Sequence, residues 1–339
     1  MDARALSVTL WVVVLVTLAG VVSHRQGLDR IQRSPWPSDT FTYDALHAET
    51  PDVLLLGSSR IAFGLSTDIV GACLGPPGDP LPTASLTVNH AAVFASAVAL
   101  REAVARGGPP RLAVMEVGPS VVSAGFPMLA GSVREAARLA DMGPCLAELP
   151  STDCLRPLVS GIEGLGRFLG GRHRADAHSQ WMMQFHGGGQ FCFDGPACEE
   201  SNRTIVRKLR RQWDNRSAEL LPTLTADHFS DYTVGSGLNH RYLEAAIALA
   251  EAEGFPLVLL NMPVHSSYQE QVPADVDRLF RAYLTVLSAS PAVTVLDANG
   301  MRQFAEQDVF IDPDHLRPSG TRRLSRYLCA QSRPLLAPR

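Results

Sequence analysis

Two short segments, one near each end of the chain, carry the side chains best suited to chemistry. The first reads V-L-L-L-G-S-S-R at 53–60, and the second reads D-P-D-H-L-R-P-S-G at 312–320. A serine hydroxyl is a weak nucleophile at neutral pH and needs a base within hydrogen-bond reach. The two segments together predict a Ser-His-Asp acyl-transfer site, with Ser59 as nucleophile, His315 as general base and Asp312 as the acid that orients the histidine.

Two of these assignments have a rival within two positions in the chain. Ser58 competes with Ser59, and a serine after a glycine also commonly caps a helix. Asp314 competes with Asp312, but its adjacency to His315 is expected to direct its side chain elsewhere. Gly57 is expected to make the turn sterically possible and to keep space near the reacting carbonyl.

The elements that position these residues read as alternating strands and helices. Near-continuous apolar runs are typical of parallel strands buried on both faces. We expect five of them, at Val53–Leu56, Ser85–Val88, Leu112–Val117, Leu257–Asn261 and Val293–Leu296. Alanine-rich stretches with helical spacing lie between them, at Ala91–Ala105, Tyr242–Glu253 and Val276–Leu287. This alternation predicts an α/β fold with a doubly wound, parallel, five-stranded sheet.

The motifs and their order resemble the SGNH/GDSL hydrolase superfamily. In that superfamily a Gly-x-Ser turn after the first strand carries the nucleophile, and one D-x-x-H element near the C-terminus carries the acid and the base. The resemblance covers about 51–120 and 240–330. It implies a flavodoxin-like strand order and assigns Ser59 over Ser58, with His315 and Asp312 as its partners.

The chain departs from this family in the residues that would hold an oxyanion. Family members add a glycine from a second block and an asparagine from a G-x-N-D block. Here the corresponding segments read V-N-H-A-A-V at 88–93 and M-E-V-G-P at 115–119. The remaining candidate donors are the backbone N–H of Ser59 and the side chain of Asn89, and a weak oxyanion hole costs about 10²–10³-fold in rate.

Two further segments resemble a narrower, membrane-anchored branch of the superfamily. G-S-S-R at 57–60 and N-M-P-V-H at 261–265 are similar to segments of proteins of alginate O-acetylation and lipoteichoic-acid D-alanylation. That branch implies an extracytoplasmic domain working beside a membrane-bound O-acyltransferase. His265 either contacts substrate or caps a strand end. Arg60 either holds a carboxylate or phosphate of the substrate or forms a structural ion pair.

The N-terminus predicts a membrane anchor. Residues 5–22 contain no charge, which reaches the lower length for a spanning helix. We therefore expect a signal-anchor helix at 1–28 and a linker at 29–50, ahead of a catalytic domain at 51–335. Cleavage as a signal peptide near Ser23 is the alternative, and it would make the protein secreted.

The six cysteines fit an oxidising compartment behind such a segment. Proximity in the chain and position at the domain ends predict three disulfides, Cys73–Cys329, Cys145–Cys154 and Cys192–Cys198. Six free thiols in a cytosolic protein are the alternative. None of these cysteines has the spacing of a zinc site, so we expect no metal.

One long stretch, 120–235, interrupts the strand-helix rhythm and holds four of the cysteines. We expect it to form a helical, disulfide-containing lid or subdomain, with a basic helix over Arg203–Arg211. A net charge of −4 gives no electrostatic case for nucleic-acid binding. The chain has no nucleotide-binding glycine loop, and acyl-serine chemistry needs no cofactor, so none is expected.

These observations together predict an extracytoplasmic serine O-acyltransferase or acyl esterase. Its substrate would be a glycan or acyl ester, and the acylated product would be part of an envelope or exported polysaccharide. Its partners would be the cytoplasmic membrane and a membrane-bound O-acyltransferase. One alternative is a free-standing carbohydrate esterase or lipase that uses the same residues. The other is a catalytically weak binding or docking partner of the membrane acyltransferase.

Overall fold

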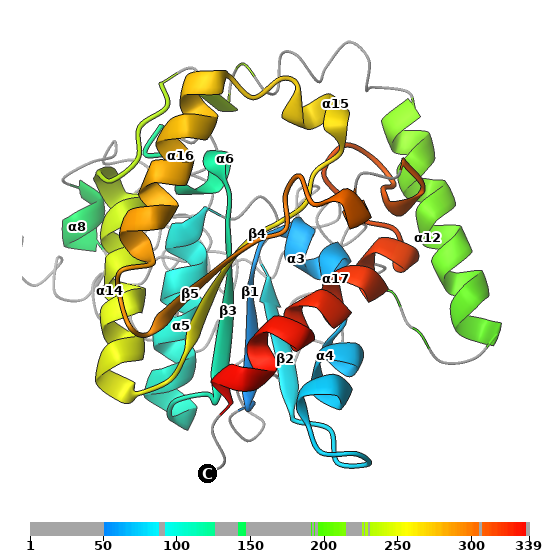
Figure 1. Cartoon of the computed structure of the whole chain (residues 1–339), viewed down its shortest axis with the longest axis horizontal. Coiled ribbons are helices and arrows are strands. Elements are labelled where there is room, and N and C mark those ends of the chain that lie inside the picture. The colour runs from blue at the N-terminus through cyan, green and yellow to red at the C-terminus, as the bar shows by residue number, and fades with distance from the viewer. Residues whose placement is uncertain are drawn as a thin grey trace, which may run out of the picture.

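A computed structural model describes a large part of the domain (Figure 1). The described residues are 51–87, 92–125, 142–146, 191, 193, 196–214, 226, 228–229, 231–304 and 307–336. The expected anchor and linker at 1–50, and most of the expected insertion, lie outside these ranges. Within them, no helix has both the length and the apolar character that crossing a membrane requires.

The core of the domain is a five-stranded sheet in which every pair of neighbouring strands is parallel. The strand order is β2-β1-β3-β4-β5, which is the flavodoxin-like order. The strands are β1 (Val53–Gly57), β2 (Thr83–Thr87), β3 (Leu112–Val117), β4 (Leu257–Asn261) and β5 (Val293–Asp297). All five predicted strands are present, although β2 begins two residues earlier than expected.

The apolar runs of the sequence explain which strands are central. Every residue of β1, β3 and β4 is buried, as expected for strands covered on both faces. The outer strands β2 and β5 contain threonines and are partly exposed. Unbroken hydrophobicity therefore marks the middle of the sheet, and mixed composition marks its edges.

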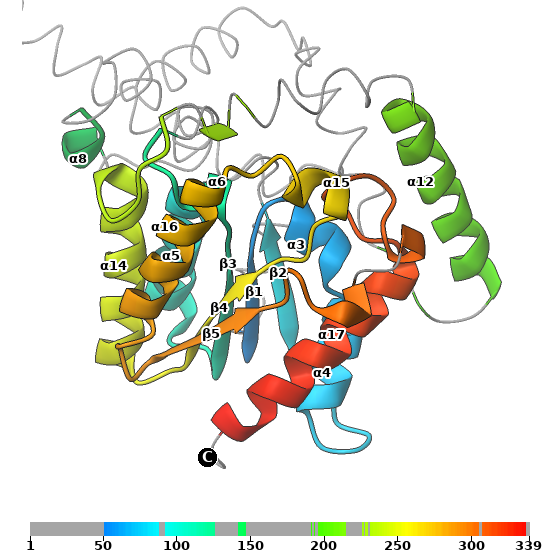
Figure 2. The same cartoon turned by 45° about the horizontal axis from the view of Figure 1, so that its top comes forward.

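Helices cover both faces of the sheet, because alternate residues of each central strand point to opposite sides (Figure 2). Leu54 and Leu56 of β1 pack on one side, and Val53 and Leu55 pack on the other. The helices on the first side are α5 (Val93–Gly107), α14 (Gly237–Glu253) and α16 (Ala274–Leu287). Those on the second side are α3 (Ser59–Gly64), α4 (Thr67–Leu74) and α17 (Pro318–Ser332). The predicted doubly wound α/β architecture is thus confirmed.

Shorter elements complete the described part of the chain. They are α6 (Pro119–Val122), α8 (Met142–Leu146), α15 (Ser266–Gln269), η2 (Arg302–Phe304), η3 (Gln307–Val309) and η4 (Arg333–Leu335). The expected basic helix is present within the longer α12 (Pro196–Asp214). Its apolar residues Ile205, Val206 and Leu209 pack in a cluster with Phe63 of α3 and Ile311.

A disulfide joins the two helices that flank β1 and β2 on the second face. Cys73 of α4 and Cys329 of α17 are bonded, with their Cα atoms 6.1 Å apart and a sequence separation of 256. This predicted pairing is therefore present. Cys145 and Cys198 are also disulfide-bonded, but their predicted partners, Cys154 and Cys192, lie outside the described residues.

Removing this bond should lower the stability of the domain, because the bond restricts the unfolded chain across almost the whole fold. We expect Cys73→Ala/Cys329→Ala to reduce the free energy of unfolding by about 2–5 kcal/mol, measured by denaturant unfolding of the oxidised protein. Cys329→Ala alone is the matched control: it also lacks the bond, so its free energy of unfolding should fall by a similar amount. A double variant as stable as the wild type would contradict a stabilising role.

Candidate active site

The turn between β1 and α3 presents two adjacent serines in different roles. Ser58 is the N-cap of α3, and its Oγ accepts the backbone N–H of Arg60 at 3.1 Å. The next residue, Ser59, is the first of the helix, and its Oγ lies 2.8 Å from His315 Nε2. Since the Ser58 hydroxyl already caps the helix, the geometry makes Ser59 the serine that faces the base.

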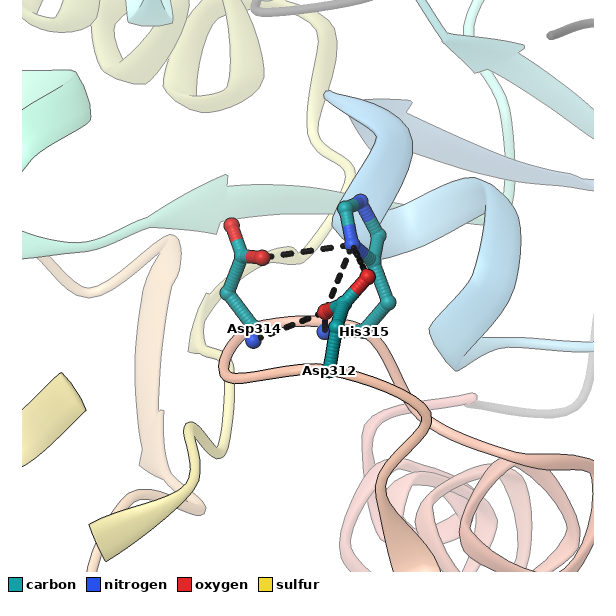
Figure 3. Close-up of side chains that lie close together, drawn as sticks. All are labelled: Asp312, Asp314 and His315. Carbon is teal, nitrogen blue, oxygen red and sulfur yellow. Dashed lines mark hydrogen bonds and ion pairs between the residues drawn. The ribbon is translucent and has the colours of Figure 1, made fainter. Parts of the chain in front are cut away.

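The three residues expected to form the site come together in space. His315 lies in the loop before α17, and its Nδ1 lies 2.9 Å from each carboxylate oxygen of Asp312 (Figure 3). Ser59, His315 and Asp312 therefore form one continuous chain of hydrogen bonds. All three side chains are largely buried, which keeps these polar contacts away from competing water.

The loop that carries His315 is held in shape by the Asp312 carboxylate. Asp312 Oδ1 also accepts the backbone N–H groups of Asp314, at 3.1 Å, and of His315, at 2.8 Å. The backbone N–H of Ile311 in turn donates to the carbonyl of His315 at 2.9 Å. This turn fixes the distance between the acid and the imidazole before any substrate is present.

Helix α17 ties this loop to α3, which carries Ser59, and to the N-cap of α4, Ser66. The hydroxyl of Thr321 donates to the carbonyl of Phe63 at 2.6 Å, and the N–H of Ser66 donates to the hydroxyl of Ser325 at 3.0 Å. The ring of Phe63 also packs edge-on against the His315 imidazole, with centroids 5.2 Å apart. The position of the base relative to Ser59 is therefore set by packing between α3 and α17.

Asp314 lies elsewhere than the sequence led us to expect. Its side chain was expected to point away from His315, but its Oδ1 is 3.2 Å from His315 Nδ1 (Figure 3). The hydrogen bonds between the Asp312 carboxylate and the backbone N–H groups of Asp314 and His315 close the turn over 312–315. This turn brings the Asp314 side chain to the same side as the His315 ring. Burial raises the pKa of Asp314, but the charges of His315 and Arg60 outweigh it, so that the pKa lies well below its usual range.

The surroundings of His315 determine its charge. Burial on its own lowers the pKa of the imidazole, because it disfavours the charged ring. The charges of Asp312 and Asp314, and the hydrogen bonds to both, raise the pKa of His315 and outweigh the effect of burial. The pKa of His315 therefore lies well above the ordinary 6.5, which favours the charged form of the ring.

A buried carboxylate, Glu116 at the end of β3, holds the serine turn from below. Its Oε2 accepts the backbone N–H of Ser58 at 2.7 Å, and its Oε1 lies 2.7 Å from Arg60 Nε. Arg60 and Glu116 are both buried, so each compensates the other's charge. The structure thus places Arg60 in an ion pair that supports the site.

Gly57 is required by this carboxylate. Its backbone is ordinary extended strand, and a Cβ at this position would lie 2.6 Å from Glu116 Oε2 and 2.5 Å from Ile61 Cγ1. The space that a side chain would occupy is therefore filled by the Glu116 carboxylate. None of these contacts tests the expectation that Gly57 leaves room for a reacting carbonyl.

His265 lies next to the loop that carries His315, and its side chain bonds within its own segment. Its Nδ1 accepts the backbone N–H of Ser267 at 3.1 Å, which caps the short helix α15. Its backbone N–H donates to the carbonyl of Pro313 at 2.8 Å, and its ring packs against Phe310. The residue therefore supports the loop that carries His315.

The oxyanion donors are described in part. Among the described residues, the backbone N–H of Ser59 has no hydrogen-bond partner, whereas that of Ser58 donates to Glu116. The Ser59 N–H is thus available for a developing oxyanion. Asn89, the second expected donor, lies outside the described residues.

One group of side chains has the composition of a metal site. Asp312, Asp314 and His315 offer ligand atoms within 4.8 Å of one another, and no other such group occurs among the described residues. A metal there would have to take His315 Nδ1 from Asp312, and it would leave Nε2 on Ser59. The observed contacts match the geometry of an acyl-transfer triad, in which Nδ1 is held by a carboxylate and Nε2 faces the serine.

Sequence reasoning did not find every residue that shapes this site. Glu116 lies near the end of a predicted strand, where the sequence does not distinguish a structural ion pair from a contact to substrate. Phe63 and Thr321 carry no signal that separates them from core or helix residues. Comparison with known proteins adds no assignment: no protein-family model matches the chain, and no curated protein matches its sequence.

The protonation state of His315 predicts how labelling of Ser59 by a fluorophosphonate depends on pH. Attack by Ser59 requires the neutral imidazole, and the raised pKa of His315 keeps the ring charged above pH 6.5. The labelling rate should therefore rise with pH, with its midpoint well above 6.5. His315→Ala, which removes the base, should label slowly at every pH. A midpoint at or below the ordinary histidine value would contradict this electrostatic picture.

Proposed function

We propose that this protein is an SGNH-like serine O-acyltransferase that forms an acyl-serine intermediate on Ser59. The observation that carries the proposal is the Ser59–His315–Asp312 chain, with contacts of 2.8 and 2.9 Å. The site follows the carboxyl end of β1, where ligands bind in sheets of this order. The strand order and the placement of the serine also agree with the resemblance to the SGNH/GDSL superfamily.

The proposed reaction has two half-steps that use the same base. Neutral His315 accepts the Ser59 hydroxyl proton at Nε2 while Ser59 Oγ attacks the acyl carbonyl. The Ser59 N–H stabilises the oxyanion, and the imidazolium returns its proton to the departing alcohol or thiol. A glycan hydroxyl then loses its proton to Nε2 and attacks the acyl-serine. As the bond to Ser59 Oγ breaks, the imidazolium gives this proton to Oγ, which releases the acylated glycan and regenerates Ser59.

The proposed location is outside the cytoplasmic membrane. The Cys73–Cys329 bond supports an oxidising compartment, and the uncharged run at 5–22 supports export with an uncleaved anchor. In this setting the acyl group would come from a membrane-bound O-acyltransferase, and the acceptor would be an envelope or exported polysaccharide. These partners rest on the likeness of G-S-S-R and N-M-P-V-H to the membrane-anchored branch.

The proposal predicts acyl transfer to sugars in preference to water. Full-length protein in detergent, incubated with p-nitrophenyl acetate and neutral or uronic-acid oligosaccharides, should give acetylated oligosaccharide, detected by mass spectrometry. Ser59→Ala should abolish the product, and Ser58→Ala should retain most of it.

Two other results would identify the alternatives. Ser59-dependent release of p-nitrophenol without sugar acetylation would indicate an esterase. Neither product from a folded protein would contradict catalysis and favour a docking partner of the acyltransferase.

A further inference from the structure

The imidazole of His315 faces two carboxylates, where a Ser-His-Asp site needs only one. Asp312 approaches Nδ1 with both oxygens at 2.9 Å, and Asp314 Oδ1 lies 3.2 Å from the same nitrogen. Figure 3 shows the two side chains converging on Nδ1 from different sides of the turn. A single N–H cannot donate fully to both, so the two carboxylates compete for it.

The two carboxylates differ in how firmly they are held. Asp312 is 10% exposed and also accepts two backbone N–H groups, so its position is fixed by the loop. Asp314 is 37% exposed, and no described backbone group donates to its carboxylate. Asp314 is therefore the carboxylate that can adjust its distance to the ring.

The titratable groups around the ring come from its own loop and from three neighbouring elements, α3, β3 and α15. Asp312 and Asp314 belong to its own loop, and α3 contributes Arg60, whose charge acts on Asp314. Glu116 lies behind Arg60 and is paired with it, and Tyr268 of α15 lies close enough to interact electrostatically with both Arg60 and Asp314. Arg60 and Glu116 balance each other, so the two aspartates leave a net negative field at the imidazole.

We propose that Asp314 is a second positioning residue for His315, which shares the Nδ1 proton with Asp312 and can hold the ring in place without it. This inference rests on the proposed function in one respect, that His315 is the base for Ser59. When His315 takes the serine proton, the two carboxylates face one imidazolium, which stabilises the intermediate. The same arrangement favours the charged ring at rest, so a smaller fraction of the resting sites holds the neutral imidazole that Ser59 needs.

The first test compares labelling of Ser59 by a fluorophosphonate in full-length variants. In a site with one acid, loss of that acid costs about 10⁴-fold in rate. We expect Asp312→Asn to lose only about 10–10²-fold, and Asp312→Asn/Asp314→Asn to lose about 10⁴-fold. Asp314→Asn alone should shift the midpoint of the pH profile to lower pH, because one of the two charges that favour the imidazolium is gone.

A matched control separates this effect from a general loss of negative charge. Asp308 lies in η3, is exposed and precedes the same loop. Asp308→Asn should leave the pH profile unchanged. The proposal is overturned if Asp312→Asn is as slow as the double variant, or if Asp314→Asn leaves the midpoint where it is.

The second test does not depend on catalysis. The His315 ring nitrogens can be titrated by NMR in a Ser59→Ala background, where no labelling occurs. Asp314→Asn should lower the His315 pKa there, and Asp308→Asn should not. If the pKa falls but wild-type Ser59 never labels, the proposed function fails and the role of Asp314 stands. If the pKa does not move in a folded variant, the role of Asp314 is excluded whatever the labelling shows.

Discussion

The position of Ser59 depends on one buried carboxylate. Glu116, on β3, accepts the N–H of Ser58 and pairs with Arg60, so it fixes the residues on both sides of Ser59. Burying an ionised group lowers the stability of the fold unless its partners are in place. Removing one partner of a buried ion pair is therefore strongly destabilising. The serine turn is therefore held by a contact between adjacent strands, and Gly57 is the residue whose small size allows it.

The sheet order makes this contact possible and brings in the second half of the site. Strand β1 lies between β2 and β3, so the end of β3 lies beside the turn that follows β1. The loop that carries His315 arrives from the far end of the sequence. Helix α17 joins it to α3 through Thr321 and to the start of α4 through Ser325. The disulfide between α4 and α17 secures the same face. A contact of 2.8 Å across 256 residues thus follows from packing around β1.

The sequence was informative where the signal is periodic or chemical. Unbroken apolar runs located the strands, and the residue types of G-S-S and D-P-D-H located side chains that do meet in space. Contacts that depend on which strands are neighbours in the sheet could not be predicted from the sequence pattern. Glu116 acquires its role only because β3 lies next to β1.

The direction of Asp314 could not be predicted for a different reason. It depends on how Asp312 captures two backbone N–H groups and curls the turn. The spacing of residues in the D-P-D-H segment carries no information on the backbone conformation of this turn. Short helices such as α4 were missed because eight residues hold too few periods, although Ser66 and Asp68 form a usable start signal.

The most direct measurement of the central claim is to trap the acyl group on the protein. Full-length protein would be mixed with p-nitrophenyl acetate, quenched in acid and digested, and the acetylated peptide would be sequenced by mass spectrometry. The account predicts acetyl on Ser59 in the wild type and in Ser58→Ala, and little in His315→Ala. Acetyl on Ser58, or acetylation that survives loss of His315, would contradict it.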